Sequence, residues 1–510
     1  MESKTTSCSL DPVPTSFLKL IMNVLLPILT QLINMSFEQG VMPGDLKKAL
    51  IIPLLKKLGL DPEILKNFRP VSNLPFLSKL IERVSAKRLL DHMNTHHLHE
   101  LFQSAYKKFH STETALIRVQ SDIHQALDEK KCVILILLDL SAAFDTIDHT
   151  ILLERLQSHT GICGKAFDWF KSYMQGRKQS VLIDHTASSM WELLFGVPQG
   201  SVLGPLLFII YTSPLGQLLR NLGISYHLYA DDTQLYLTFD LENASDRIKT
   251  IEKAVLLIKD WMAKNFLCLN DDKTEVLVIA SQSTLSKLTV PSVSIGDETI
   301  SPAKYVRNIG FYFDETMNLQ KQISVTCKSA WFHLRNIGKI SQYLDKQSTE
   351  RLIHAFITSK LDVNNSLLYG LPDTLLQRLQ RVQNTAARLL TRIKKTDHIT
   401  PILRELHWLP ISHRISYKVL LITFKALHGL APSYIKELLT FRTVSLRSMR
   451  SDNQGFLIVP RSRTVTYGDR NFRVFAPTLW NKLPKSIRTC DKLSDFKRQL
   501  KTYLFKAAYG

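Results

Sequence analysis

The sequence predicts a mixed α+β fold from two kinds of hydrophobic pattern. Residues 132–138 form a continuous apolar run, which is typical of a strand buried on both faces. Residues 226–230 and 233–239 alternate apolar and polar side chains, which predicts two half-buried strands joined as a hairpin. Residues 244–266 and 375–393 instead repeat their apolar side chains at helical spacing, with charged side chains opposite. Strands and long amphipathic helices are therefore expected in one chain.

Two adjacent carboxylates, Asp231 and Asp232, lie between the two strands of the predicted hairpin. Like charges held this close raise one another's pKa unless a cation binds beside them, and a divalent metal ion is the usual cation. An Asp-Asp pair is also common in an ordinary solvated turn. Residues 229–232 therefore indicate either a metal site or a simple turn.

A third carboxylate, Asp139, directly follows the apolar run at 132–138. A lone Asp after a strand is usually a turn residue or a helix cap. Together with the Asp pair, however, it supplies three carboxylates on rigid β elements. A two-metal phosphoryl-transfer site requires such a set, because two Mg²⁺ ions roughly 3.5–4 Å apart must be held by oxygen ligands.

Seven segments, in order along the chain, resemble the motifs of reverse transcriptases from LINE-type (non-LTR) retrotransposons. They are residues 67–72 with the helix at 79–88, then 103–116, 139–149, 196–205, 229–232, 269–274 and 308–314. The most specific is Asp-Leu-Ser-Ala-Ala-Phe-Asp at 139–145, followed later by Gly-Val-Pro-Gln-Gly at 196–200 and Tyr-Ala-Asp-Asp at 229–232. The chain departs from the usual pattern at Leu46, Ala105 and Ile309, where the family more often has Trp, Gly and Leu.

The resemblance implies a right-hand polymerase architecture. It divides the chain into a helical extension at 1–42, a fingers and palm domain at 43–318, a helical thumb at 319–400 and a basic C-terminal region at 401–510. The implied activity is RNA-directed DNA synthesis, in which dNTPs are added to a primer 3′-hydroxyl by two-metal phosphoryl transfer. The alternative is a catalytically inactive, nucleic-acid-binding remnant of a retrotransposon. Related elements usually carry an endonuclease N-terminal to this domain, and we expect this chain to lack one.

The same resemblance assigns the metal ligands. Asp139 and Asp231 are expected to hold two Mg²⁺ ions, for which Mn²⁺ is an alternative. Asp232 completes the catalytic set, and the Leu140 carbonyl is expected to add a further ligand.

Five other positions are expected to contact the incoming nucleotide: Arg69, Phe144, Gln199, Gly200 and Lys273. Arginine suits bidentate contacts to phosphate oxygens, and glycine permits a close backbone approach. The resemblance makes Phe144 a gate beneath the sugar that excludes a 2′-hydroxyl, although a core Phe on a short turn is the alternative. Lys273 is either the proton donor to the leaving pyrophosphate or a solvated loop residue.

The helix predicted at 375–393 carries four arginines on the face opposite its apolar stripe: Arg378, Arg381, Arg388 and Arg392. A row of cations on one helical face suits a polymerase thumb that grips the backbone of a duplex without reading its sequence. A merely solvated basic face has the same pattern.

Charge is distributed unevenly along the chain. The net charge is +20, and residues 321–510 hold 33 Lys and Arg against 11 Asp and Glu, which leaves the remainder near neutral. A basic C-terminal part indicates a polyanion partner, here an RNA template and a DNA primer. A generic basic surface is the alternative.

Cysteine usage and hydropathy argue against several other classes of protein. The six cysteines are scattered without a C-x-x-C pair, which argues against structural zinc and a disulfide framework and favours a reducing compartment. Polar residues interrupt the apolar segment at 17–37, so we expect an amphipathic helix there instead of a membrane span, and no signal peptide. We therefore expect an intracellular protein of the nucleus or cytoplasm, with no membrane partner.

Overall fold

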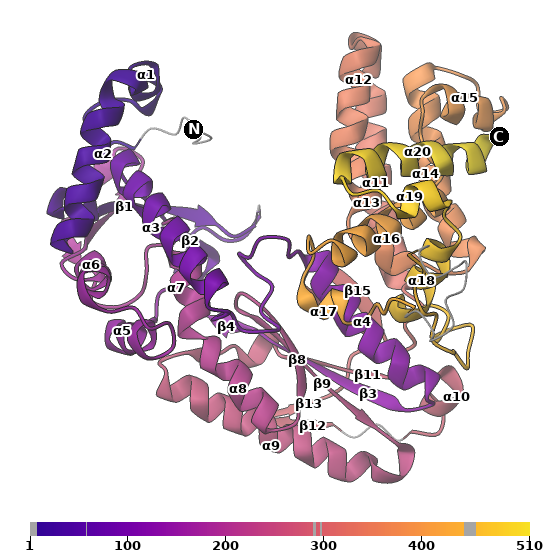
Figure 1. Ribbon diagram of the computed structural model, residues 1–510, viewed down its shortest axis with the longest axis horizontal. Coiled ribbons are helices and arrows are strands. Elements are labelled where there is room, and N and C mark those ends of the chain that lie inside the picture. The colour runs from indigo at the N-terminus through magenta and orange to yellow at the C-terminus, as the bar shows by residue number, and fades with distance from the viewer. Residues whose placement is uncertain (1–7, 58, 289–291, 296–297, 443–454) are drawn as a thin grey trace. The chain divides into compact units, whose positions relative to one another are not determined.

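The computed structural model describes residues 8–57, 59–288, 292–295, 298–442 and 455–510. The chain divides into two compact units, each assembled from separate stretches of sequence. The first unit comprises residues 1–106, 139–223 and 254–272, and the second comprises 107–138, 224–253 and 273–510. Helices and strands occur in both units (Figure 1), which confirms the predicted α+β class.

The first unit contains two small sheets and a set of helices. Its strands are β1 (Lys48–Leu55), β2 (Phe68–Asn73), β4 (Leu140–Ser141), β5 (Lys178–Ile183), β6 (Thr186–Ala187), β7 (Trp191–Glu192) and β10 (Cys268–Leu269). Its helices are α1 (Thr15–Leu20), α2 (Met22–Gln39), α3 (Phe76–Thr95), α5 (His149–Ser158), α6 (Gly164–Met174), α7 (Gly204–Tyr211) and α8 (Ser213–Asn221). Helix α9 (Ala244–Lys264) begins in the second unit and ends in the first.

Strand β1 lies at the centre of the larger sheet in the first unit. It pairs with β2 in antiparallel and with β5 in parallel, and β5 also pairs with β6 and β7. The predicted N-terminal helix is present as α1 and α2, and α2 is capped by Gly40, whose left-handed φ of 69° suits a glycine. Helix α2 packs against α6, where the Trp169 indole donates a 3.0 Å hydrogen bond to Ser36 Oγ.

A carboxylate is buried at the centre of the first unit. Glu82 of α3 is fully buried, and its Oε2 accepts hydrogen bonds from the amides of Val202 at 2.6 Å and Leu203 at 3.2 Å. Burial raises the pKa of Glu82, and the nearby buried Arg177 guanidinium opposes that rise. Glu82 therefore fastens α3 to the loop that opens α7, through two backbone donors that a helix start leaves unpaired.

The second unit contains a four-stranded antiparallel sheet, two hairpins and most of the helices. Its strands are β3 (Cys132–Leu138), β8 (Ser225–Tyr229), β9 (Asp232–Phe239), β11 (Glu275–Ile279), β12 (Val293–Ile295), β13 (Glu298–Ile300), β14 (Tyr305–Asn308) and β15 (Phe311–Asp314). Its longer helices are α4 (Thr112–Asp128), α11 (Gln320–Ile340), α12 (Lys346–Ile353), α14 (Asp373–Thr391), α16 (Ile411–Leu427), α18 (Phe472–Asn481) and α20 (Leu493–Tyr509). Shorter helices are α10 (Gln282–Leu285), α13 (Ser359–Asp362), α15 (Ile399–Glu405), α17 (Ser433–Lys436) and α19 (Lys485–Arg488).

The four-stranded sheet has the order β11-β3-β9-β8, with β3 in its interior. Residues 132–136 of β3 are each fully buried, which confirms the strand predicted from the apolar run. Helix α4 packs on β3 and β8. The hairpin predicted around residues 226–239 is also confirmed, because β8 and β9 pair in antiparallel.

A second hairpin, β14–β15, is fastened to this sheet. Its turn residues Ile309 and Gly310 both have positive φ, of 35° and 91°, as a two-residue hairpin turn requires. The buried Asn308 amide donates a 2.7 Å hydrogen bond to Gln234 Oε1 of β9. At the other end, the Asp314 carboxylate accepts the Leu319 amide at 2.6 Å and leads the chain into α11.

The C-terminal residues pack on α4 within the second unit, where α17 and α18 contact this helix (Figure 1). Ser121 and Asn471 exchange two hydrogen bonds, with Ser121 Oγ to Asn471 Oδ1 at 2.5 Å and Asn471 Nδ2 to the Ser121 carbonyl at 2.8 Å. The buried His124 Nδ1 donates to the Arg470 carbonyl at 2.9 Å. The last part of the chain is therefore built into the core of this unit.

Removing the buried carboxylate should destabilise the first unit. We expect Glu82→Ala to lower its free energy of unfolding by about 3 kcal/mol, because two buried amides and the Arg177 guanidinium lose their acceptor or countercharge. Urea denaturation measures the change, with Glu38→Ala on the exposed surface of α2 as a matched control. Equal stability of the two variants would contradict this role of Glu82.

The buried histidines of the second unit should make it sensitive to acid. Burial lowers the pKa of His124 to about 3, with the charge of Arg470 adding to the effect, whereas an unfolded chain protonates histidine near pH 6.5. Since the unfolded state binds more protons, this stability is present above pH 6.5 and is lost as the pH falls toward 3. We expect His124 alone to cost about 2 kcal/mol of unfolding free energy between pH 7 and pH 5.

Denaturation at the two pH values tests this expectation. His124→Gln should be less stable than the native chain at pH 7 and should lose less stability on acidification. The exposed His398→Gln variant should keep the native pH dependence. An unchanged pH dependence in His124→Gln would show that the acid sensitivity arises elsewhere.

Candidate active site

The register of the four-stranded sheet determines where Asp139, Asp231 and Asp232 lie. Leu138, the last residue of β3, pairs with Thr233 of β9. The β8–β9 hairpin closes at the pair Tyr229–Asp232, with Ala230 and Asp231 as its two turn residues. Because Asp139 follows Leu138 and Asp232 precedes Thr233, the chain carries these carboxylates to one end of the sheet. Asp139 and Asp231 are half-buried and Asp232 is exposed.

Asp139 is held through its backbone. Its carbonyl accepts the Asn270 amide at 2.9 Å. The next residue, Leu140, is buried in β4 and pairs with Leu269 of β10. The strand exit is thus tied into a second, two-stranded ladder, which limits the freedom of the carboxylate.

Lys273 also belongs near this end of the sheet by register. Strand β11 runs antiparallel to β3 and begins with Glu275 opposite Leu137. Lys273 is exposed at the end of the 3-10 helix Asp271–Lys273, two residues before β11 begins. The strands therefore carry Lys273 and the carboxylates toward the same end of the sheet.

Phe144 and Gln199 lie in two loops of the first unit that are bonded to each other. The Val197 amide donates to the Phe144 carbonyl at 2.9 Å, and Gln199 Nε2 donates to Asp145 Oδ2 at 2.7 Å. Burial raises the pKa of Asp145, and the bond from Gln199 opposes that rise. The half-buried Phe144 ring stacks on Phe208 of α7, with ring centroids 4.8 Å apart. This ring therefore rests on the core while part of it stays accessible.

The loop at 196–200 needs glycine at both ends. A Cβ on Gly200, whose φ is 127°, would lie 2.6 Å from the Ser72 carbonyl oxygen. A Cβ on Gly196, with φ of 82°, would lie 2.8 Å from the Asp145 carbonyl oxygen. The Ser72 amide in turn donates to the Gln199 carbonyl at 2.7 Å. The close backbone approach predicted for this loop is therefore made to β2, the strand on which Arg69 lies exposed.

Glu82 lies in the helix predicted at 79–88, but no motif gives it a role. Its two amide partners, Val202 and Leu203, follow Gln199 and Gly200 by a few residues. A Glu in the middle of a helix carries no local signal of burial, so only the packed structure reveals its contact with the loop. Glu82 fixes the loop from the side of α3.

The four arginines of the α14 region do not form a single free row. Arg378 donates to Ser324 Oγ at 3.1 Å and Arg388 donates to the Asp397 carbonyl at 3.3 Å. Arg392 lies beyond the helix end, where it adopts a left-handed φ of 57°. Arg381 is exposed on the helix.

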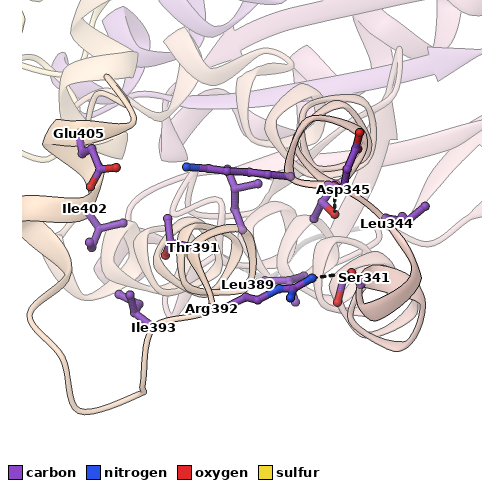
Figure 2. Close-up of a pocket in the computed structure, with 12 residues that line it drawn as sticks. Ser341, Leu344, Asp345, Leu389, Thr391, Arg392, Ile393, Ile402 and Glu405 are labelled. Carbon is purple, nitrogen blue, oxygen red and sulfur yellow. Dashed lines mark hydrogen bonds between the residues drawn. The ribbon is translucent and has the colours of Figure 1, made fainter.

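Arg392 lines a pocket of about 490 Å³ in the second unit. Figure 2 shows its side chain reaching Ser341, to whose carbonyl it donates a 3.3 Å hydrogen bond. Asp345 and Glu405 also line this pocket, together with Ile393 and Ile402. Acidic, basic and apolar groups are mixed there, which differs from the uniformly cationic surface that a nucleic-acid backbone attracts.

Helix α11 presents a more continuous basic face. Lys328, Phe332, Arg335 and Lys339 follow one another at spacings of four, three and four residues, which places them on one side of the helix. All four are exposed, and Phe332 exposes 60% of its surface. Cations interleaved with an exposed aromatic ring are typical of surfaces that bind single-stranded nucleic acid. The spacing is visible in the sequence, but the exposure of Phe332 is not.

The oxygen-rich end of the sheet has the chemistry that Mg²⁺ prefers. Among the described residues, no three His, Cys, Asp or Glu side chains converge into a ready-made metal cage. Mg²⁺ seldom uses such a cage, because it binds through one or two carboxylates together with waters and substrate phosphates. Asp139, Asp231 and Asp232 carry oxygen donors of the type that such an ion takes.

Comparison with known proteins identifies relatives among mobile elements. The chain is 25% identical over 390 residues to a probable RNA-directed DNA polymerase from transposon BS of Drosophila melanogaster, covering 73% of this chain and 41% of that protein. It is 28% identical over 313 residues to the RNA-directed DNA polymerase from mobile element jockey of Drosophila funebris, covering 60% and 33%. The chain thus spans less than half the length of these relatives.

A solved structure and a model of a protein family also match this chain. The apo telomerase of Candida tropicalis matches with a TM-score of 0.42 and 10% identity, over 79% of this chain and 68% of that one. In the part of the chain that the structure describes, no helix combines the length and apolarity needed to cross a membrane. The family model described as reverse transcriptase (RNA-dependent DNA polymerase) matches residues 55–313, half of the chain. The chain therefore belongs to the reverse transcriptase family and is related to the polymerases of non-LTR retrotransposons.

Proposed function

We propose that this protein is an RNA-directed DNA polymerase of a non-LTR retrotransposon, with a right-hand architecture. In this proposal residues 43–318 form fingers and palm, 319–400 form the thumb and 401–510 form a basic C-terminal region. The observation that carries the proposal is the β3–β9 register, which brings Asp139 and Asp231–Asp232 to one end of a sheet inside the family match. The reaction is the addition of a dNTP to a primer 3′-hydroxyl on an RNA template.

Asp139 and Asp231 are the proposed ligands of two Mg²⁺ ions, with Asp232 and the Leu140 carbonyl completing the site. Bound metal would supply neutralisation of the charge on the transferring phosphoryl group. The protein contributes position: β3 and the β8–β9 hairpin are rigid elements, and the ladder at Leu140 anchors Asp139. In phosphoryl transfer the protein contributes mainly the positioning of the reacting groups and electrostatic stabilisation.

Arg69, Phe144, Gln199, Gly200 and Lys273 are the residues proposed to contact the nucleotide. Arg69 lies exposed on β2, beside the strand segment that receives the loop of Gln199 and Gly200. Arg69 would bind the triphosphate, and Lys273 would give a proton to the leaving pyrophosphate. Phe144 would stand beneath the sugar, supported from behind by Phe208.

Template and primer are proposed to contact the helices of the thumb. Arg381 of α14 and the exposed basic face of α11 are cations available to phosphates. Arg378, Arg388 and Arg392 would contribute to the same potential from positions where they also bond to neighbouring segments. Binding through these groups should weaken steeply with salt, because it releases condensed counterions.

Primer extension on an RNA template tests the catalytic carboxylates. Asp231→Asn should lower the rate by roughly 10³-fold, because losing a metal ligand removes about 4 kcal/mol of transition-state stabilisation. Asp246→Asn, at an exposed position on α9, should extend like the native chain. If the native chain binds RNA in a salt-sensitive manner but extends no primer, it is a binding remnant and the proposal is wrong.

The sugar gate gives a second test. Phe144→Val should raise the use of ribonucleotides relative to dNTPs by about tenfold, or about 1.4 kcal/mol of discrimination, since a smaller side chain admits the 2′-hydroxyl. Phe144→Tyr keeps the ring and should keep the native preference. Competition of matched rNTP and dNTP pairs measures the ratio. An unchanged ratio in Phe144→Val would leave Phe144 as a core residue only.

A further inference from the structure

Tyr434, in the C-terminal region, packs against β8, the strand that precedes Asp231. It lies in the short helix α17 and is almost completely buried. Its hydroxyl donates a 3.2 Å hydrogen bond to Thr114 Oγ1 of α4. Its ring meets the ring of His227 edge-on, with centroids 5.1 Å apart and an interplanar angle of 89°.

His227 lies on β8, two residues before Tyr229, which closes the hairpin with Asp232. Strand β8 is at the edge of the sheet and has β9 as its one strand neighbour there. Because β8 has a paired strand on one side only, its position also depends on what packs against its face. The His227 ring is fully buried beneath Tyr434, so α17 supplies part of that packing.

A polar chain reaches the other strand of the same hairpin. Tyr236 of β9 donates a 2.6 Å hydrogen bond to Asp122 Oδ2, which also accepts Arg118 Nε at 3.0 Å. Arg118 Nη1 in turn approaches Glu437 Oε2 at 3.4 Å and the Tyr434 carbonyl at 3.5 Å. Both strands of the hairpin are therefore connected to residues 434–437, β8 through the edge-on contact of His227 with Tyr434 and β9 through charge-assisted hydrogen bonds.

We propose that Tyr434 is a positioning residue for the reaction: the C-terminal region braces the β8–β9 hairpin and so holds Asp231 where the metal ions need it. This inference rests on the proposed function for its catalytic consequence, while the brace itself is a property of the chain alone. It gives part of residues 401–510 a role distinct from binding nucleic acid.

Hydrogen–deuterium exchange of the full chain without metal tests the brace directly. Tyr434→Leu removes the ring that faces His227 and should speed exchange in residues 225–239 by about tenfold, the effect of about 1.4 kcal/mol of lost local stability. Tyr434→Phe keeps the ring and should remain within about threefold of the native rate. Phe496→Leu truncates an equally buried ring of α20, which stacks on Phe424 of α16 and not on His227, and should leave this segment unchanged.

Primer extension, scaled to the folded fraction, tests the consequence. Tyr434→Leu should raise the Mg²⁺ concentration for half-maximal rate several-fold, whereas Phe496→Leu should lower only the amount of folded enzyme. Unchanged exchange in Tyr434→Leu, or equal acceleration in Phe496→Leu, would overturn the brace. Faster exchange with a native Mg²⁺ dependence would overturn the positioning role. If the native chain extends no primer, the proposed function fails. The hydrogen–deuterium exchange experiment still tests the brace in that case.

Discussion

Antiparallel pairing between β3 and β9 is the constraint on which the rest of the structure depends. The two strands are in register over seven residue pairs, from Cys132–Phe239 to Leu138–Thr233. A slip by one residue would turn every side chain of a strand to the opposite face and would bury the wrong set. It would also shift Asp139 relative to Asp232 by about 3.4 Å along the strand direction. Core burial and carboxylate alignment are therefore satisfied by the same register.

Buried polar groups fasten the loops and segments around this sheet and around the helices of the first unit. Glu82 binds two amides beside the glycine loop, and Asn471 binds Ser121 of α4. Such bonds are costly to leave unmade inside a protein, so each one fixes a single arrangement of the segments that it joins. The arrangement thus depends on a few directional contacts in addition to apolar packing.

Some side chains of the basic C-terminal region are exposed, and others are buried in the second unit. Its excess of cations is exposed along helices such as α20, while Tyr434, Arg470 and Asn471 are buried against α4 or its neighbours. Burial lowers the pKa of Arg470 to about 10, and its guanidinium donates to the Met317 carbonyl at 3.0 Å. A region whose composition suggests only a polyanion partner therefore also completes the core of the second unit.

The sequence by itself determined the local elements and the family. The apolar run of β3 and the alternation of β8 and β9 each encode their structure within a few neighbouring residues, because periodicity is a local property. The motifs identified the carboxylates in the same way. Tertiary structure alone decided that Glu82 meets Val202, that Arg378 and Arg388 bond to neighbouring segments, and that Tyr434 covers His227. These partners lie far apart in the chain, and no local pattern specifies which distant side chain will fill a given space once the core has closed.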